Sequence, residues 1–176
     1  MSKLSNVVVL KGYYNNIQTS LNSNELLIEI PSDISISKSV DKLIWKDGIL
    51  TYIITIDNKS NISYNNLIIT DVINTQLVGF IPKSIKINGV KTDDKYIYDN
   101  DTHTLTFKLD QIDSNSTIIM SFSVKKNKND FFALTSNCKM YCNEEEYTSN
   151  YITVVSLIKK TYSLKNYGCD VGHWRI

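Results

Sequence analysis

The chain has 176 residues, of which 42% are hydrophobic and 21% are charged, and its formal net charge is +1. This composition excludes a disordered chain and provides no surplus of charge for binding nucleic acid or an anionic membrane. No stretch approaches the roughly 18 apolar residues of a membrane-spanning helix, and the N-terminus lacks the apolar core of a classical signal peptide.

Residues 1–33 are predicted to form an extension that consists of a strand and a linker. The segment NVVVLKGYY, residues 6–14, is rich in β-branched residues, which favour strands. Residues 15–24 are polar and rich in serine and asparagine, so we expect a flexible linker there. The segment ELLIEI, residues 25–30, is a further short strand that Pro31 ends.

Residues 34–158 are predicted to form the main domain, because apolar and polar residues alternate there with the period of a strand. The clearest strands are expected at 49–56, 67–72, 104–109 and 118–125, and a last pair at 132–142 and 147–158. Asn88-Gly89 is a strong signal for a two-residue hairpin. Short strands at this spacing, without a helical period, predict an all-β Greek-key β-sandwich, which a C-terminal tail at 159–176 follows.

The main domain resembles the DUF11 repeat, an immunoglobulin-like domain of bacterial and archaeal surface proteins. The likeness lies in the segments ITIDN, LIITDVI, VGFIPKSIKING, LDQIDSNSTIIMSFSV and EEEYTSNYITV, which keep the family's order. The matching positions are Asn58, Asp71, Ser84, Asn88, Gly89 and Asn150. The resemblance covers residues 34–155 and implies an immunoglobulin-like sandwich that serves as a structural or adhesive surface module, without enzymatic activity or a cofactor.

A shorter resemblance lies upstream. The segments VVLKGYY and LLIEIPSDIS look like the sequence that precedes such domains in clostridial spore-associated proteins. This resemblance implies a location on the spore surface or another extracellular surface. The missing signal peptide agrees with it, because a protein made in the mother cell and placed on a spore needs no secretion signal.

The three cysteines, Cys138, Cys142 and Cys169, are candidates for disulfide bonds between subunits. Cys138 and Cys142 are four residues apart on a predicted strand, so their Cα atoms should lie roughly 13 Å apart. A disulfide needs less than about 7 Å, which excludes a bond between these two cysteines on a regular strand. A bond from Cys169 to either cysteine of a neighbour remains, as does the alternative of reduced thiols.

Both ends of the chain carry candidates for subunit contacts. Val7, Val8, Val9 and Leu10 lie in the N-terminal strand, and Tyr167, Trp174 and Ile176 lie in the tail. The N-terminal strand pairs either with its own domain or with an open sheet edge of a neighbour. The tail covers either its own core or that of a neighbour, and aromatic residues suit the centre of an interface.

Lys38, Asn150 and Asp71 are candidates for an isopeptide bond. Some Gram-positive immunoglobulin-like domains carry such a Lys–Asn bond beside a buried carboxylate, so the resemblance implies the same for these positions. The sequence shows no metal-ligand spacing, no phosphate-binding loop and no nucleophile elbow. We therefore expect neither an enzyme nor a metal site.

These observations predict a structural subunit that self-assembles head-to-tail into a surface filament, appendage or coat layer on a bacterial spore. Strand addition and intermolecular disulfides would make the contacts, so the partner is another copy of the same chain, with no nucleic acid and no membrane. The alternative is a monomeric adhesive or carbohydrate-binding surface domain.

Overall fold

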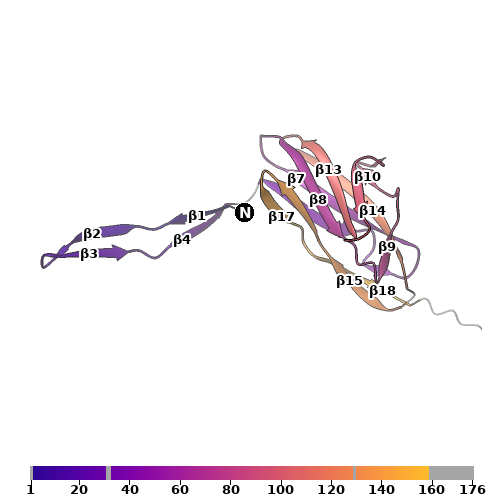
Figure 1. The fold of residues 1–176 in the computed structure, drawn as a ribbon, viewed down its shortest axis with the longest axis horizontal. Helices are drawn as coiled ribbons and strands as arrows, with labels where there is room; N and C mark the ends of the chain where they lie inside the picture. The colour runs from indigo at the N-terminus through magenta and orange to yellow at the C-terminus, as the bar shows by residue number, and fades with distance from the viewer. Residues whose placement is uncertain (1, 31–32, 129, 159–176) are drawn as a thin grey trace, which may run out of the picture.

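The computed structural model describes residues 2–30, 33–128 and 130–158, and the regular elements in this part of the chain are all β-strands. Figure 1 shows a sandwich of strands from which a long ribbon of antiparallel strands extends. We call residues 2–30 the N-terminal ribbon and residues 34–158 the sandwich. The described residues contain no helix that is long and apolar enough to cross a membrane.

One sheet of the sandwich is built on the long strand β7 (Ile49–Asn58), whose side chains alternate between buried and partly exposed, as the spacing of its apolar residues predicts. β7 pairs with β5 (Ile34–Val40) on one side and with β14 (Ser116–Lys126) on the other. The strands beyond β14 are β9 (Val78–Phe80), β10 (Lys86–Ile87) and β11 (Val90–Lys91).

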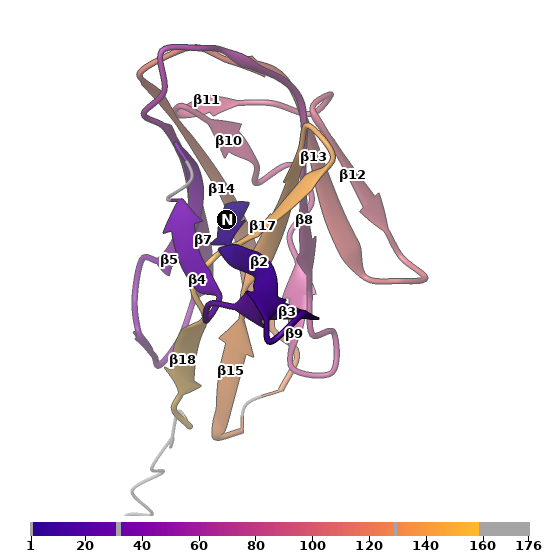
Figure 2. The same ribbon diagram turned by 90° about the vertical axis from the view of Figure 1, so that its left-hand side faces the viewer.

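The facing sheet has five strands in the order β12-β13-β8-β16-β17. Their bounds are Tyr64–Val72 for β8, Tyr96–Asp99 for β12, Thr104–Ile112 for β13, Cys138–Cys142 for β16 and Glu145–Thr148 for β17. A smaller sheet lies at one end of the sandwich, in the order β15-β18-β6 (Figure 2). Its strands are β15 (Phe132–Ser136), β18 (Ile152–Ser156) and β6 (Ile44–Trp45).

The inward side chains of both sheets form one apolar core. Its largest fully buried members include Trp45, Phe107, Phe122, Leu50, Ile54, Leu67 and Leu105. Burial of each such side chain contributes about 1.5–3 kcal/mol. The whole core cluster comes from residues 34–154, so the sandwich holds its shape without the N-terminal ribbon. The prediction of an all-β, immunoglobulin-like β-sandwich is confirmed.

The chain enters the sandwich at one end and its last described strand finishes at the other. Ile34, the first residue of β5, pairs with Asn58 at the end of β7. Ser156, the last residue of β18, pairs with Trp45, which precedes the start of β7. The start of β5 and the end of β18 therefore lie at opposite ends of β7.

The N-terminal ribbon is a double-stranded antiparallel structure. β1 (Ser2–Asn6) pairs with β4 (Leu26–Ile30), and β2 (Val9–Tyr14) pairs with β3 (Ile17–Asn22). The two pairs are joined where the Ser23 N–H donates to the Val8 carbonyl over 2.8 Å, and the Val8 N–H donates to the Ser23 hydroxyl over 3.0 Å. The ribbon is thus one continuous element.

The predicted flexible linker is wrong for most of its length, because β3 occupies residues 17–22. The turn at Asn15 and Asn16 explains the difference. Both residues have positive φ, 49° and 62°, and they form a two-residue loop between β2 and β3. Such loops are the mirror-image turns that match the twist of a hairpin, and asparagine tolerates the left-handed conformation that they require.

Candidate functional site: the N-terminal ribbon and the buried Lys38 cluster

The ribbon exposes apolar side chains along its length. The candidates read from the sequence, Val7, Val8, Val9 and Leu10, are 44%, 64%, 49% and 66% exposed. Four further exposed apolar residues were missed: Tyr13, Ile17, Leu21 and Leu26. Ile17 and Leu21 were missed because they stand between polar residues, in a segment whose composition predicts a linker. These side chains are candidates for an interaction surface, because large exposed apolar patches often mark such sites.

The register places these apolar residues on defined faces of the ribbon. Leu10 pairs with Leu21, and two residues further along β2, Gly12 pairs with Thr19. Cross-strand partners lie on the same face of a pair of strands, and residues two apart share a face. Gly12 has nothing within 4 Å of the place where a Cβ would lie. A hollow of about 250 Å³ therefore lies over the ribbon, lined by Leu10, Lys11, Gly12, Tyr13, Thr19 and Leu21.

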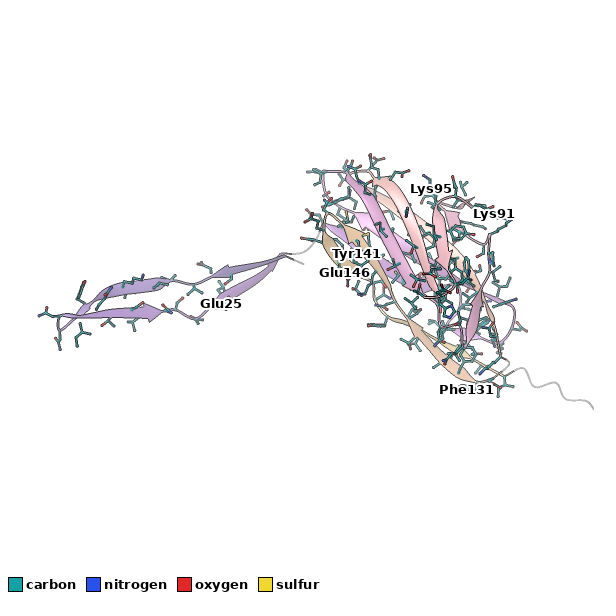
Figure 3. The ribbon with its side chains drawn as sticks, viewed as in Figure 1. Glu25, Lys91, Lys95, Phe131, Tyr141 and Glu146 are labelled. Atoms are coloured by element: carbon teal, nitrogen blue, oxygen red, sulfur yellow. The ribbon has the colours of Figure 1, made fainter. Side chains whose placement is uncertain are left out.

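The ribbon buries little of this surface against the rest of the described chain. Its described side chains are exposed along both strands, apart from the half-buried Thr19. Isolated two-stranded hairpins are marginally stable at best in water, because they cannot cover an apolar face. Figure 3 shows the ribbon, with Glu25 labelled, extending away from the sandwich. The described part of the chain therefore leaves the apolar side chains of the ribbon in contact with solvent.

A second cluster lies inside the sandwich, where Lys38 of β5 meets Asp71 of β8. The Lys38 Nζ lies 2.6 Å from the Asp71 Oδ2, and the two side chains are 0% and 2% exposed. The same ammonium donates to the Ser136 hydroxyl over 2.9 Å and lies 4.4 Å from the centre of the Tyr52 ring. Burial raises the pKa of Asp71 to about 6, although Lys38 opposes the shift. Burial likewise raises the pKa of Tyr52 to about 12.

This cluster joins the two sheets and has little room for a ligand. The cavity beside it has a volume of about 30 Å³, enough for one water molecule. In the described part of the chain, no group of three or more histidine, cysteine or acidic side chains is placed to hold a metal ion. The arrangement suits a structural ion pair in the core.

The structure brings the three isopeptide candidates together, but the contacts differ from one another. Lys38 reaches Asp71 and Ser136 with its ammonium. Asn150 instead bonds the Lys38 main chain, accepting from its N–H and donating to its carbonyl, each over 2.9 Å. The isopeptide bond stays a prediction. Intact-mass analysis checks it, because the bond expels one ammonia.

Cys138 and Cys142 lie at the two ends of β16 and are 1% and 2% exposed. Both are free thiols, and burial raises the pKa of Cys138 to about 11 and that of Cys142 above its usual value. A buried thiol of high pKa is a poor partner for a disulfide between subunits. Cys169 lies outside the described residues, as do the contact candidates Tyr167, Trp174 and Ile176.

Comparison with solved structures supports the fold. The N-terminal domain of the Streptococcus gordonii adhesin Sgo0707 matches with a TM-score of 0.54 and 14% identity, over 80% of this chain and 36% of that chain. The C-terminal domain of the Streptococcus pyogenes antigen I/II-family protein AspA matches with a TM-score of 0.53 and 16% identity, over 77% of this chain and 50% of that one.

A third match is the C-terminal domain of the Streptococcus agalactiae AgI/II polypeptide BspA, with a TM-score of 0.51 and 10% identity, over 88% of this chain and 58% of that one. The chain thus spans from about a third to just under three fifths of these structures. Neither a family model nor a curated protein sequence matches the chain. The class that the fold defines is an all-β, immunoglobulin-like sandwich of the kind found in these bacterial domains, and the resemblance to DUF11 stays a prediction.

Proposed function

We propose that the protein is a structural subunit of a bacterial surface, which self-assembles head-to-tail into a filament, appendage or coat layer on a spore. The observation that carries this proposal is the N-terminal ribbon, a paired element whose exposed apolar side chains are not covered by the described part of the chain. A contact between unlike surfaces of two copies generates an open filament when its rotation does not close a ring.

The ribbon supplies the two things that strand addition needs. Among the described residues, its strands pair with each other along one side only, so each keeps an outer row of main-chain N–H and carbonyl groups for a new partner. Its apolar side chains can be buried against that partner, and their spacing would set the register of the added strand. A disulfide through Cys169 and docking of the tail would add to the contact in the assembled state.

The adhesin and antigen I/II descriptions of the structural neighbours support a surface location. They also favour a second candidate, in which the protein is a monomeric adhesive or carbohydrate-binding surface domain. The two functions differ in what the purified chain does at high concentration: a subunit polymerises, whereas a monomeric adhesin stays a monomer.

The test uses the full-length chain, imaged by negative-stain microscopy and followed by sedimentation velocity, with and without reductant. We expect wild type to form filaments or large oligomers, and the pair Leu10→Ser/Leu21→Ser to sediment as a monomer. The matched control is Leu43→Ser/Ile62→Ser, which removes two apolar side chains of similar exposure, 57% and 61%, from the sandwich. A monomeric wild type at all concentrations would refute the proposal.

A further inference from the structure

Each of the two large sheets ends on two edge strands, and the edges on one side of the sandwich are closed. β5 is one of them, and the Asn150 side chain occupies the main-chain N–H and carbonyl of Lys38 there, as a neighbouring strand would. β17 is the other. It carries Glu145 and Glu146, directly after Glu144, and Figure 3 shows Glu146 beside Tyr141. Consecutive charges of one sign on an edge oppose the addition of a strand.

The opposite side of the sandwich is open. β12 covers only the first part of β13, from Thr104 to Phe107, and the Lys108 N–H donates to the Lys95 carbonyl over 3.1 Å. Main-chain groups of alternate residues point to the same side of a strand. The N–H and carbonyl groups of Asp110 and Ile112 therefore face this side, where the described residues provide no further strand.

A trough lies along this open edge, between the β10–β11 hairpin and β13. Its volume is about 410 Å³, within the range of ligand-binding clefts. Ile87, Val90, Leu109 and Ile118 are its apolar lining residues. Lys95 and Asp110, which also line it, form an ion pair of 2.8 Å. Figure 3 shows Lys91 and Lys95 on this part of the surface.

We propose that the trough between the β10–β11 hairpin and β13 receives the apolar face of the N-terminal ribbon from a second copy of the chain. The inference rests on the proposed self-assembly and names its acceptor site. Free main-chain groups beside an apolar trough are what an added strand requires, since the main chain supplies affinity and the alternate side chains supply specificity.

The occupant is a second copy because the ribbon of the same chain joins the sandwich at the sheet edge opposite to the trough. It leads into β5, which is separated from β10 by β7 and β14 in the sheet. Figure 1 shows the ribbon extending away from the sandwich. The ribbon and the trough are both apolar and complementary in shape. The Leu10–Leu21 pair provides apolar side chains for the trough, and the hollow over Gly12 accepts Val90, which is 71% exposed.

The first test places a charge in the trough of the full-length chain. Val90→Arg changes a residue that is 71% exposed, so the fold is unaffected, and Tyr151→Arg is the matched control with the same 71% exposure beside the closed edge. We expect Val90→Arg to weaken association at least about tenfold by sedimentation velocity, and Tyr151→Arg to assemble as wild type. Normal assembly of Val90→Arg, with Leu10→Ser/Leu21→Ser monomeric, would overturn the acceptor site and leave the proposed function intact.

The second test mixes the two defective proteins. Leu10→Ser/Leu21→Ser keeps an intact trough, and Val90→Arg keeps an intact ribbon, so their mixture has one working contact. We expect a one-to-one heterodimer that grows no further, detected by native mass spectrometry. Two monomers in the mixture would refute the inference. A Leu10→Ser/Leu21→Ser protein that polymerises by itself would also refute it, because assembly would then not need the apolar face of the ribbon, and the proposed self-assembly would stand.

A third variant fills the hollow on the ribbon. Gly12→Val adds a side chain into open space at a residue whose φ is not positive, so the ribbon keeps its pairing. Its control is Ser20→Val, an exposed position next to Thr19 that points to the opposite face of the ribbon and does not line the hollow. We expect Gly12→Val to reduce association at least about tenfold and Ser20→Val to leave it unchanged. Equal association of Gly12→Val and wild type would show that the hollow stays empty in the assembly and would overturn the docking face.

Discussion

Lys38 and Asp71 form an ion pair that crosses the core from one sheet to the other. Both partners are charged groups removed from water, and their attraction offsets only part of the cost of burial. The pair is 2.6 Å long, and Ser136 supplies an additional hydrogen bond to the ammonium. Loss of one partner leaves the other charge buried without compensation, whereas loss of both leaves no charge to bury.

This reasoning predicts the outcome of a double-mutant cycle. Lys38→Met and Asp71→Leu should each lower the free energy of unfolding by about 3–5 kcal/mol. The double variant should be more stable than either single variant, because apolar groups of similar size then face each other. Urea denaturation of the four proteins measures the effect. A double variant whose loss equals the sum of the single losses would show that the two residues act independently.

The raised pKa of Asp71 predicts a dependence of stability on pH. The folded carboxyl has a pKa of about 6 against an ordinary value of 3.8, so the folded state binds more protons between these values. The contribution of Asp71 to stability therefore falls as the pH rises from about 4 to about 6. Tyr52 and Cys138, which interact with Asp71, have pKa values of about 12 and 11 and do not titrate in this window.

The measurement compares the free energy of unfolding of wild type and Asp71→Leu across that window. We expect the advantage of wild type to shrink as the pH rises. An advantage that grows with pH would mean that the folded state favours the ionised carboxylate.

At the scale of an element, the ribbon depends on its turn. Asn15 and Asn16 both have positive φ, a conformation that costs an ordinary residue roughly 1–2 kcal/mol and glycine almost nothing. Asn16→Gly should therefore strengthen the pairing of β2 with β3, and Asn16→Val should weaken it by about 1–2 kcal/mol. Hydrogen exchange of the β2 and β3 amides measures both changes, and the amides of β7 in the sandwich serve as the internal control.

The strands of the sandwich could be predicted from the sequence, because one face of each strand is buried and the other is more exposed, so apolar and polar residues alternate along it. β7, β13 and β14 all follow the alternation of apolar residues. The described side chains of the ribbon form no buried face, so β3 carries no such pattern. The signal that could have revealed it is Asn15-Asn16 between two segments of equal length, β2 and β3.

Parts of the candidate site could not be predicted because they form only in the folded chain. Ile87 and Leu109 line the same trough although they come from different sheets. The burial of Cys138 and Cys142 depends on the position of β16 between β8 and β17, which strand spacing does not reveal. The contact of Lys38 with Asp71 was anticipated through the family resemblance alone.

At the scale of the whole molecule, the assembly is expected to depend on apolar contacts more than on charge. The net charge is +1, and the proposed contact joins Leu10 and Leu21 to an apolar trough. Salt screens interactions between exposed charges, but sulfate strengthens apolar burial and cooling weakens it.

We therefore expect the association constant to change less than about threefold between about 0.1 M and about 1 M sodium chloride. Assembly should be stronger in sulfate and weaker in the cold. Light scattering at several salt concentrations and temperatures measures these responses. A steep loss of assembly in sodium chloride would point to ion pairs as the main contact.

The position of the start of β5, paired with the last residue of β7, has a mechanical consequence for a filament. Tension carried in through the ribbon acts on Ile34 along the axis of β5, toward the end of the sandwich where the chain enters. Such a pull slides β5 against β7 in shear, so the seven residue pairs from Ile34 to Val40 must give way together instead of opening one after another. A filament of these subunits would therefore need a high force to stretch, because the β5–β7 hydrogen bonds in each sandwich share the load and do not break one at a time.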